Sequence, residues 1–110
     1  MRHGLCIGIN DYPGTESDLS GCVNDAHDWA DELTKRGFDV TTMLDAEATG
    51  AAMRDAIRHR VGAAASGDLV VITYSGHGSW IPDPDQDEPD ARDEVLCPYD
   101  IAQKRPLTDD

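Results

Sequence analysis

The chain has 110 residues, which is enough for one compact domain or for a piece of one. Its 22 Asp and Glu residues outnumber nine Lys and Arg residues and give a formal net charge of −13 at pH 7. This charge repels nucleic-acid phosphates and anionic membrane surfaces, so we expect neither as a partner, whereas cationic substrates and divalent metal ions are compatible with it. An acidic excess can also serve only to keep a chain soluble.

The start of the chain and its cysteines indicate a cytoplasmic protein with reduced thiols. The first apolar run, residues 5–9, is too short and too soon interrupted by polar residues to be a signal peptide or a membrane span. The cysteines are odd in number, far apart and without a Cys-x-x-Cys pair, which argues against a disulfide framework and against a zinc site. They are Cys6, Cys22 and Cys97.

The first half of the chain predicts a strand, a helix and a second strand. Residues 5–9 form an apolar run that suits a strand buried on both faces. After a loop rich in turn formers, Ser20 can cap a helix that ends at Gly37. Residues 38–44 follow as a strand. The apolar positions of the helix recur at intervals of four and three residues: Cys22, Ala26, Ala30 and Leu33.

The second half continues the alternation. Thr49 can cap a helix whose apolar face repeats every four residues at Met53, Ile57 and Val61, and residues 62–67 close it. Residues 69–74, Leu-Val-Val-Ile-Thr-Tyr, give the strongest strand signal in the chain.

This order of elements predicts an α/β sandwich, because strand–helix–strand units join parallel strands through right-handed crossovers that cover both faces of the sheet. Residues 82–94 contain seven acids and three prolines without periodicity and are expected to form an acidic loop. Residues 95–99 are expected to form a short edge strand, since Pro98 excludes a central one.

Chemistry is expected where the first and third strands end, because ligands of open parallel sheets collect at the carboxyl ends of the strands. The first strand ends at Asn10 and Asp11, and the third runs into Ser75, Gly76, His77 and Gly78. The glycines allow the backbone to approach a substrate closely. His77 is thus presented at the end of a strand, where an imidazole can exchange protons near neutral pH.

These residues carry a family resemblance that covers essentially the whole chain. In order and spacing, the chain resembles the large-subunit half of metacaspases, which are caspase-like cysteine peptidases. The resemblance implies the N-terminal part of a caspase-like three-layer sandwich, a mainly parallel sheet flanked by helices, with residues 1–110 as one domain that stops before the catalytic cysteine. The matching segments are residues 5–10, 19–26 and 71–78 with Asp93, Glu94, Asp109 and Asp110.

The resemblance implies a cysteine endopeptidase with a Cys–His dyad. His77 matches the residue that takes the thiol proton, and the amide of Gly78 matches the oxyanion donor. The nucleophilic cysteine of caspases follows the histidine by roughly 50 residues, beyond Asp110 here. We therefore expect the remainder of the domain to supply it, and this chain alone to be inactive.

The resemblance also implies substrates with Arg or Lys before the cleaved bond. Cys22, Asp25 and Ser75 match substrate-pocket positions, and Cys22 and Asp25 share one helix face. The alternative for Asp25 is an acid that only favours the helix dipole.

Calcium is the implied activator. Asp93, Asp109 and Asp110 match family ligands. Two alternatives remain open: a solvated acidic loop, and an EF-hand-like loop that has Glu88 in place of the turn glycine. The ligands of that EF-hand-like loop would be Asp83, Asp85, Asp87 and Glu94.

A rival function is a non-catalytic caspase-like module that binds calcium or a partner through the same surface. A phospho-receiver domain has a similar order of elements, but it needs an acidic pair after the first strand and an Asp after the third. Asp11 and His77 stand there instead.

Overall fold

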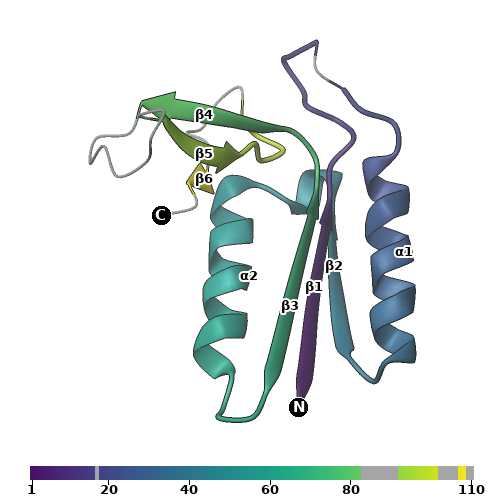
Figure 1. The fold of residues 1–110 in the computed structure, drawn as a ribbon. Helices are drawn as coiled ribbons and strands as arrows, with labels where there is room; N and C mark the ends of the chain where they lie inside the picture. The colour runs from purple at the N-terminus through teal and green to yellow at the C-terminus, as the bar shows by residue number, and fades with distance from the viewer. Residues whose placement is uncertain (17, 83–91, 102–106, 109–110) are drawn as a thin grey trace.

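The computed structural model describes residues 1–16, 18–82, 92–101 and 107–108, without the side chains of 79–82, 92–94 and 107–108. Its centre is a parallel sheet with the strand order β2-β1-β3. One helix covers each face of this sheet, as the alternation of elements predicts (Figure 1). The elements are β1 (Arg2–Gly8), α1 (Cys22–Lys35), β2 (Asp39–Leu44), a 3-10 helix (Asp45–Glu47), α2 (Gly50–Ala63) and β3 (Leu69–Ser75).

The central strand β1 is buried on both faces, which confirms the expectation for its apolar run. Leu5 and Ile7 pack with Met53 of α2, whereas Cys6 packs with Ala26 of α1. All of these residues are fully buried. Alternate side chains of one strand therefore join the two helices into a three-layer sandwich.

The two helices begin differently. Thr49 caps α2 as predicted, because its hydroxyl accepts the amide of Ala52 at 3.3 Å. The expected cap of α1 by Ser20 is wrong, since the N-cap position is Gly21 and makes no side-chain bond. A residue that lies outside the helix, Asn10, takes over that role.

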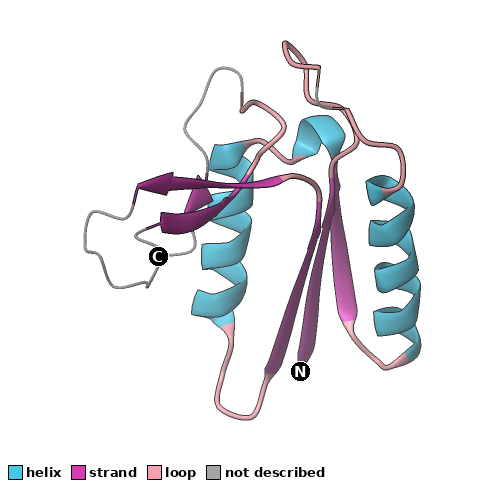
Figure 2. Cartoon of the chain, turned by 45° about the horizontal axis from the view of Figure 1, so that its top comes forward, coloured by secondary structure: helices cyan, strands magenta, loops and turns pink. Residues whose placement is uncertain are grey.

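A second, antiparallel sheet follows the first, with β4 (Gly78–Pro82), β5 (Arg92–Leu96) and β6 (Leu107–Thr108). It crosses the N-terminal end of α2 (Figure 2). The expected loop 82–94 is thus wrong at both ends. The strand expected at 95–99 lies three residues earlier, and it is the middle strand of this sheet and not an edge strand, because Pro98 lies outside it. Strand pairing outweighed the acidic, proline-rich composition from which we expected a loop, because strand propensity depends on context. Residues 83–91 lie outside the described part of the chain.

The segment after β5 fastens the second sheet to the first layer. The Gly50 amide donates to Asp100 Oδ1 at 2.9 Å, and the Tyr99 amide donates to the carbonyl of Ala48 at 2.9 Å. Pro98 lies against Gly50: a Cβ atom on Gly50 would be 3.5 Å from the Cγ atom of Pro98. The start of α2 is therefore held by residues about fifty positions later in the chain.

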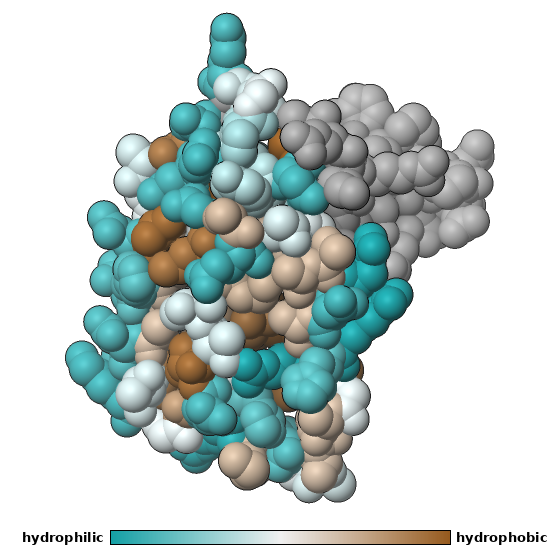
Figure 3. Space-filling model, turned by 180° about the vertical axis from the view of Figure 1, so that it is seen from behind, coloured by the Kyte–Doolittle hydropathy of each residue, from teal (hydrophilic) through white to brown (hydrophobic). Residues whose placement is uncertain are grey.

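Several large apolar side chains are exposed on the surface of the sandwich. Seen from behind, apolar patches lie toward the middle of the molecule between hydrophilic side chains (Figure 3). Among the described residues, β3 pairs only with β1, and Leu69 and Ile72 of β3 are 54% and 37% exposed. None of the described helices is long and apolar enough to cross a membrane.

Candidate active site

The loops after β1 and β2 meet the end of β3 at one edge of the parallel sheet, here called the carboxyl edge. Asp45, which follows β2, accepts the amides of Asn10 at 2.8 Å and Asp11 at 3.0 Å through one carboxylate oxygen. The Ile9 amide donates to the carbonyl of Ser75 at 3.0 Å. Asp45 has a φ of 46°, a left-handed conformation that Asp tolerates better than most residues. Three strand ends are thereby joined.

Asn10 connects this edge to α1. Its side-chain oxygen accepts the amides of Cys22 at 2.8 Å and Val23 at 3.3 Å, and its carbonyl accepts the amide of Leu19 at 2.7 Å. Amides in the first turn of a helix have no partner within the helix, so a side chain from another loop can cap them. The position of the α1 start is therefore set by the end of β1.

The start of α1 also packs very closely on β1. A Cβ atom on Gly8 would lie 2.5 Å from the carbonyl oxygen of Cys22 and 2.9 Å from the Cβ of Ala26, so only glycine fits there. Ser75 is the partner of Gly8 in the β1–β3 register. Two of the predicted pocket residues, Cys22 and Ser75, thus flank Gly8, while Asp25 is exposed one turn further along α1.

The thiol of Cys22 is kept protonated by its surroundings. Burial raises its pKa, and the carboxylates of Asp25 and Asp45 raise the pKa further because they disfavour a second negative charge. Burial also raises the pKa of the Cys97 thiol. A nucleophilic cysteine needs the opposite environment. These conditions argue against either thiol as a nucleophile, and they place two acids beside Cys22.

His77 lies in the short link between β3 and β4, and its backbone is bound on both sides. Its amide donates to Tyr12 Oη at 2.8 Å. Its carbonyl accepts from Tyr74 Oη at 2.6 Å and from the amide of Cys97 at 3.0 Å. The Tyr12 ring lies 5.1 Å from the imidazole, at an interplanar angle of 55°. His77 is partly exposed, whereas Tyr12 is 1% exposed.

The carboxyl edge thus holds two groups of residues. Tyr12 and Tyr74 hold His77 on the side of the sheet that faces α2, because both tyrosines pack in the apolar cluster of that face. Cys22 and Asp25 lie on the α1 side. Gly78, the predicted oxyanion donor, follows His77 as the first residue of β4, opposite Leu96.

The predicted calcium ligands are not brought together by described side chains. Asp93 belongs to β5, where only its backbone is described, and Asp109 and Asp110 lie outside the described residues. Asp83, Asp85 and Asp87 of the alternative loop lie outside them too, and Glu94 is described only by its backbone. Among the described side chains, no three His, Cys, Asp or Glu residues are grouped as they would be to hold a metal ion.

The sequence reasoning did not assign a role to several residues that build this edge. Asp45 directly follows the second strand, and Asn10 follows the first. A polar residue just after a predicted parallel strand was therefore the signal that could have identified both. The hydroxyls of Tyr12 and Tyr74 had no such signal, because their partners are recognised only in three dimensions.

Comparison with known proteins gives a consistent result. Residues 2–110 match the family model for the metacaspase, peptidase C14 domain. Metacaspase-7 of Arabidopsis thaliana is 39% identical over 99% of this chain, which covers 28% of that protein. Metacaspase-1 of Saccharomyces cerevisiae is 37% identical over 99% of this chain and 27% of its own length. A crystal structure of a Geobacter sulfurreducens protein superposes with a TM-score of 0.82 at 38% identity, covering 99% of this chain and 42% of that one.

Proposed function

The chain belongs to the metacaspase family of caspase-like cysteine peptidases, and from that premise we propose that it supplies the general base of an endopeptidase that cuts after Arg or Lys. The observation that carries the proposal is the fixed backbone of His77 at the carboxyl edge, beside a separate acidic group around Cys22. The chain spans between a quarter and a third of the length of the curated metacaspases it matches. The nucleophilic cysteine would come from the remainder of the domain.

The proposed reaction uses His77 twice. Its imidazole takes the proton of the cysteine thiol, and the thiolate sulfur then bonds to the scissile carbonyl carbon. The amide of Gly78 donates to the developing oxyanion. The imidazolium returns its proton to the leaving amine as the carbon–nitrogen bond breaks, and water hydrolyses the thioester. A fixed backbone favours this exchange because small displacements of a catalytic group cost large factors in rate.

The preference for a cationic side chain is proposed to come from the acids beside Cys22. Asp25 and Asp45 are both close enough to act on the Cys22 thiol. An Arg or Lys side chain that enters between them would gain charge-assisted hydrogen bonds. Asp25 is exposed in this chain, so we propose that the remainder of the domain covers it.

The outer edge of β3 is the proposed docking site for that remainder. This edge pairs with no strand in the described part of the chain, and Leu69 and Ile72 on β3 are exposed. An unpaired strand edge with exposed apolar side chains is favourable for the addition of a further strand. A strand added there would end close to His77.

Calcium is proposed as the activating ion. Support comes from the pairing of β5, which contains Asp93, with β6, which directly precedes Asp109 in the sequence. Calcium takes six to eight oxygen ligands, so carboxylates from two neighbouring segments can form part of its shell. Calorimetric titration of the chain and of its Asp109→Asn, Asp110→Asn variant tests this. Equal calcium affinity in both would move the site, most simply to Asp83, Asp85, Asp87 and Glu94.

The decisive experiment uses an extended chain in which residues 1–110 continue into the segment that carries the nucleophile. Peptides that differ only in Arg, Lys, citrulline or Ala before the scissile bond are compared. We expect turnover of the Arg and Lys peptides, and none by residues 1–110 alone. Asp25→Asn should lower kcat/KM for Arg by about tenfold or more and change it little for citrulline, because only the charged pair is lost.

Asp31→Asn is the matched control, since it removes the same charge from an exposed position further along α1. Equal losses for Arg and citrulline in Asp25→Asn would make Asp25 a structural residue. An extended chain that is folded but cleaves none of these peptides would favour the non-catalytic module instead.

A further inference from the structure

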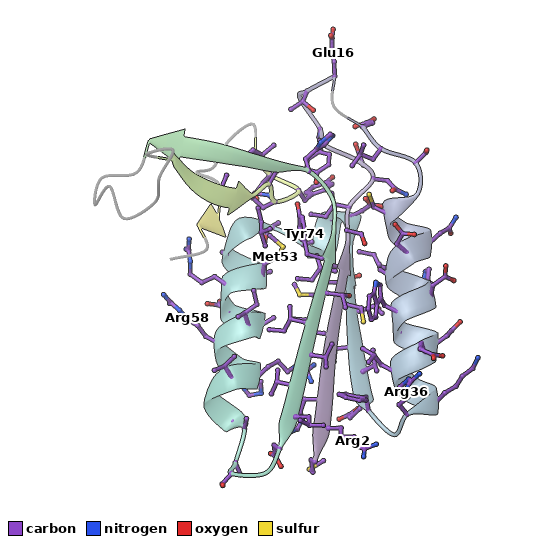
Figure 4. The ribbon with its side chains drawn as sticks, in the orientation of Figure 1. Arg2, Glu16, Arg36, Met53, Arg58 and Tyr74 are labelled. Atoms are coloured by element: carbon purple, nitrogen blue, oxygen red, sulfur yellow. The ribbon has the colours of Figure 1, made fainter. Side chains whose placement is uncertain are left out.

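Two tyrosine hydroxyls hold both peptide groups of His77. We propose that Tyr12 and Tyr74 are positioning residues for the general base: together they form a clamp that fixes the backbone of His77 while its imidazole changes protonation state. The role in catalysis rests on the proposed function, whereas the clamp itself is a property of this chain. Tyr74 and the neighbouring Met53 side chain lie between α2 and the sheet, beneath the second sheet (Figure 4).

The clamp binds both the amide and the carbonyl of His77. Tyr12, from the loop after β1, accepts the His77 amide at 2.8 Å. Tyr74, from the end of β3, donates to the His77 carbonyl at 2.6 Å and lies 2.8 Å from the Cys97 carbonyl. The two hydroxyl oxygens are 3.3 Å apart. The clamp therefore ties His77 to β1, β3 and the segment after β5.

The number of hydroxyl protons determines which atom donates in each hydrogen bond of the clamp. Tyr74 has one hydroxyl proton, and the His77 and Cys97 carbonyls can only accept it. Tyr12 accepts the proton of the His77 amide, so its own proton is available for the Tyr74 oxygen. The chain of hydrogen bonds thus runs from the His77 amide through the Tyr12 and Tyr74 hydroxyls to the His77 carbonyl. It begins and ends on the same residue. Each hydroxyl uses both its donor and its acceptor capacity.

Gly76 makes room for this arrangement. A Cβ atom at Gly76 would lie 2.6 Å from Tyr12 Oη and 2.7 Å from Tyr74 Oη. The φ of Gly76 is outside the left-handed region. Space for the two hydroxyls, rather than backbone conformation, therefore requires glycine before His77.

The clamp does not titrate in the range where an imidazole works. Burial raises the pKa of Tyr12 and of Tyr74 above that of a free tyrosine. Both hydroxyls thus keep their protons at neutral pH. The clamping bonds go to the peptide groups of His77 and not to its ring nitrogens, so a change of protonation on the ring leaves them intact.

The first test uses residues 1–110 and needs no activity. Hydrogen exchange of the His77 amide is measured by NMR in Tyr12→Phe, with the buried Ile7 amide of β1 as the reference for global unfolding. Phe keeps the ring and removes the acceptor, so we expect His77 exchange to accelerate about fivefold or more beyond any change at Ile7. Tyr99→Phe is the control, because Tyr99 packs in the same cluster but does not bind a peptide group of His77. Unchanged relative exchange in Tyr12→Phe would overturn the clamp.

The second test uses the extended chain. We expect Tyr12→Phe and Tyr74→Phe each to lower kcat by about tenfold with KM unchanged, and Tyr99→Phe to lower neither. Faster His77 exchange with an unchanged kcat would overturn the positioning role. A parent chain without turnover would refute the proposed function, and the exchange experiment would still decide on the clamp.

Discussion

The two edges of the parallel sheet are built from different kinds of interaction. At the carboxyl edge, the uncharged side chains of Asn10, Tyr12 and Tyr74 bind backbone groups. The Asp45 carboxylate at this edge also binds backbone amides and, in the described part of the chain, no cation. At the opposite, amino edge, the Met1 ammonium lies 2.6 Å from Asp68, and His3 Nε2 lies 3.5 Å from the same carboxylate. Arg2 there donates to the carbonyl of Arg36, near the end of α1 (Figure 4).

Because of this difference, the neutral hydrogen bonds of the carboxyl edge and the ion pairs of the amino edge are expected to respond differently to pH. Buried neutral hydrogen bonds are costly to break because the partner left behind is unpaired. Ion pairs with an exposed partner, such as the Met1 ammonium, contribute little and respond to pH and salt. The bonds of Asn10, Tyr12 and Tyr74 at the carboxyl edge are thus expected to stay intact across the pH range in which Asp68 titrates.

The largest effect is expected from removing the imidazole at the carboxyl edge. In the extended chain, His77→Ala should lower kcat by about 10²–10⁴-fold, since general acid–base catalysis contributes factors of this size. The unfolding midpoint should change little, because the clamp binds the backbone of residue 77. His59→Ala, at an exposed position of α2, is the control. Near-normal turnover in His77→Ala would refute the dyad.

The next effect is on stability. Gly76→Ala should lower the free energy of unfolding by about 3 kcal/mol, because the new methyl group cannot fit without displacing both tyrosine hydroxyls. Gly62→Ala in α2 is the matched control. It meets no atom within 4 Å and should be neutral or stabilising by about 0.5–1 kcal/mol. Urea unfolding measures both, and equal midpoints would show that the edge can rearrange.

A smaller loss is expected where the carboxyl edge meets α1. Asn10→Ala removes the acceptor for the Cys22 and Val23 amides and should cost about 1 kcal/mol, the usual range for a helix cap. Asn24→Ala removes the same group from an exposed position of α1. Similar urea midpoints for the two variants would mean that water replaces the Asn10 side chain as the acceptor without loss of stability.

The smallest effect is expected at the amino edge. The Ala65 amide and the Met1 ammonium lower the pKa of Asp68 from its ordinary 3.8 to about 2. A carboxylate whose pKa is lower in the folded state stabilises the fold above its unfolded pKa, and this contribution disappears as the pH falls toward 2. Between pH 5 and pH 2.5, the urea unfolding midpoint of Asp68→Asn should therefore fall slightly less than that of the parent.

Glu16→Gln, at the exposed tip of the loop after β1 (Figure 4), is the charge-matched control for Asp68→Asn and should follow the parent. If Asp68→Asn followed the parent as well, the amino edge would not be the source of this pH dependence.

The sequence predicted the elements whose signals are local. The run 69–74 and the cap Thr49 were correct because strand propensity and capping depend on nearby residues. The cap of α1 was not, because the side chain that caps it is twelve residues away in Asn10. The second sheet was missed because its pairing outweighs its acidic composition.

The candidate site was predictable only as a location. Family motifs and the rule that ligands bind at the carboxyl ends of parallel strands drew attention to His77. What holds it could not be read from the sequence, because Tyr12 precedes His77 by 65 residues. A hydroxyl's partners become known only when the strands are placed in register.

The space at Gly76 also has a consequence for evolution. Because one missing methyl group accommodates two hydroxyls, the three positions 12, 74 and 76 cannot vary independently. A larger residue at 76 is tolerable only after smaller side chains have replaced both tyrosines, because a Cβ atom would lie within 2.7 Å of each hydroxyl, and the tyrosines can return only after glycine does. Relatives with both tyrosines should therefore have glycine at 76, whereas relatives with glycine at 76 can have other residues at 12 and 74.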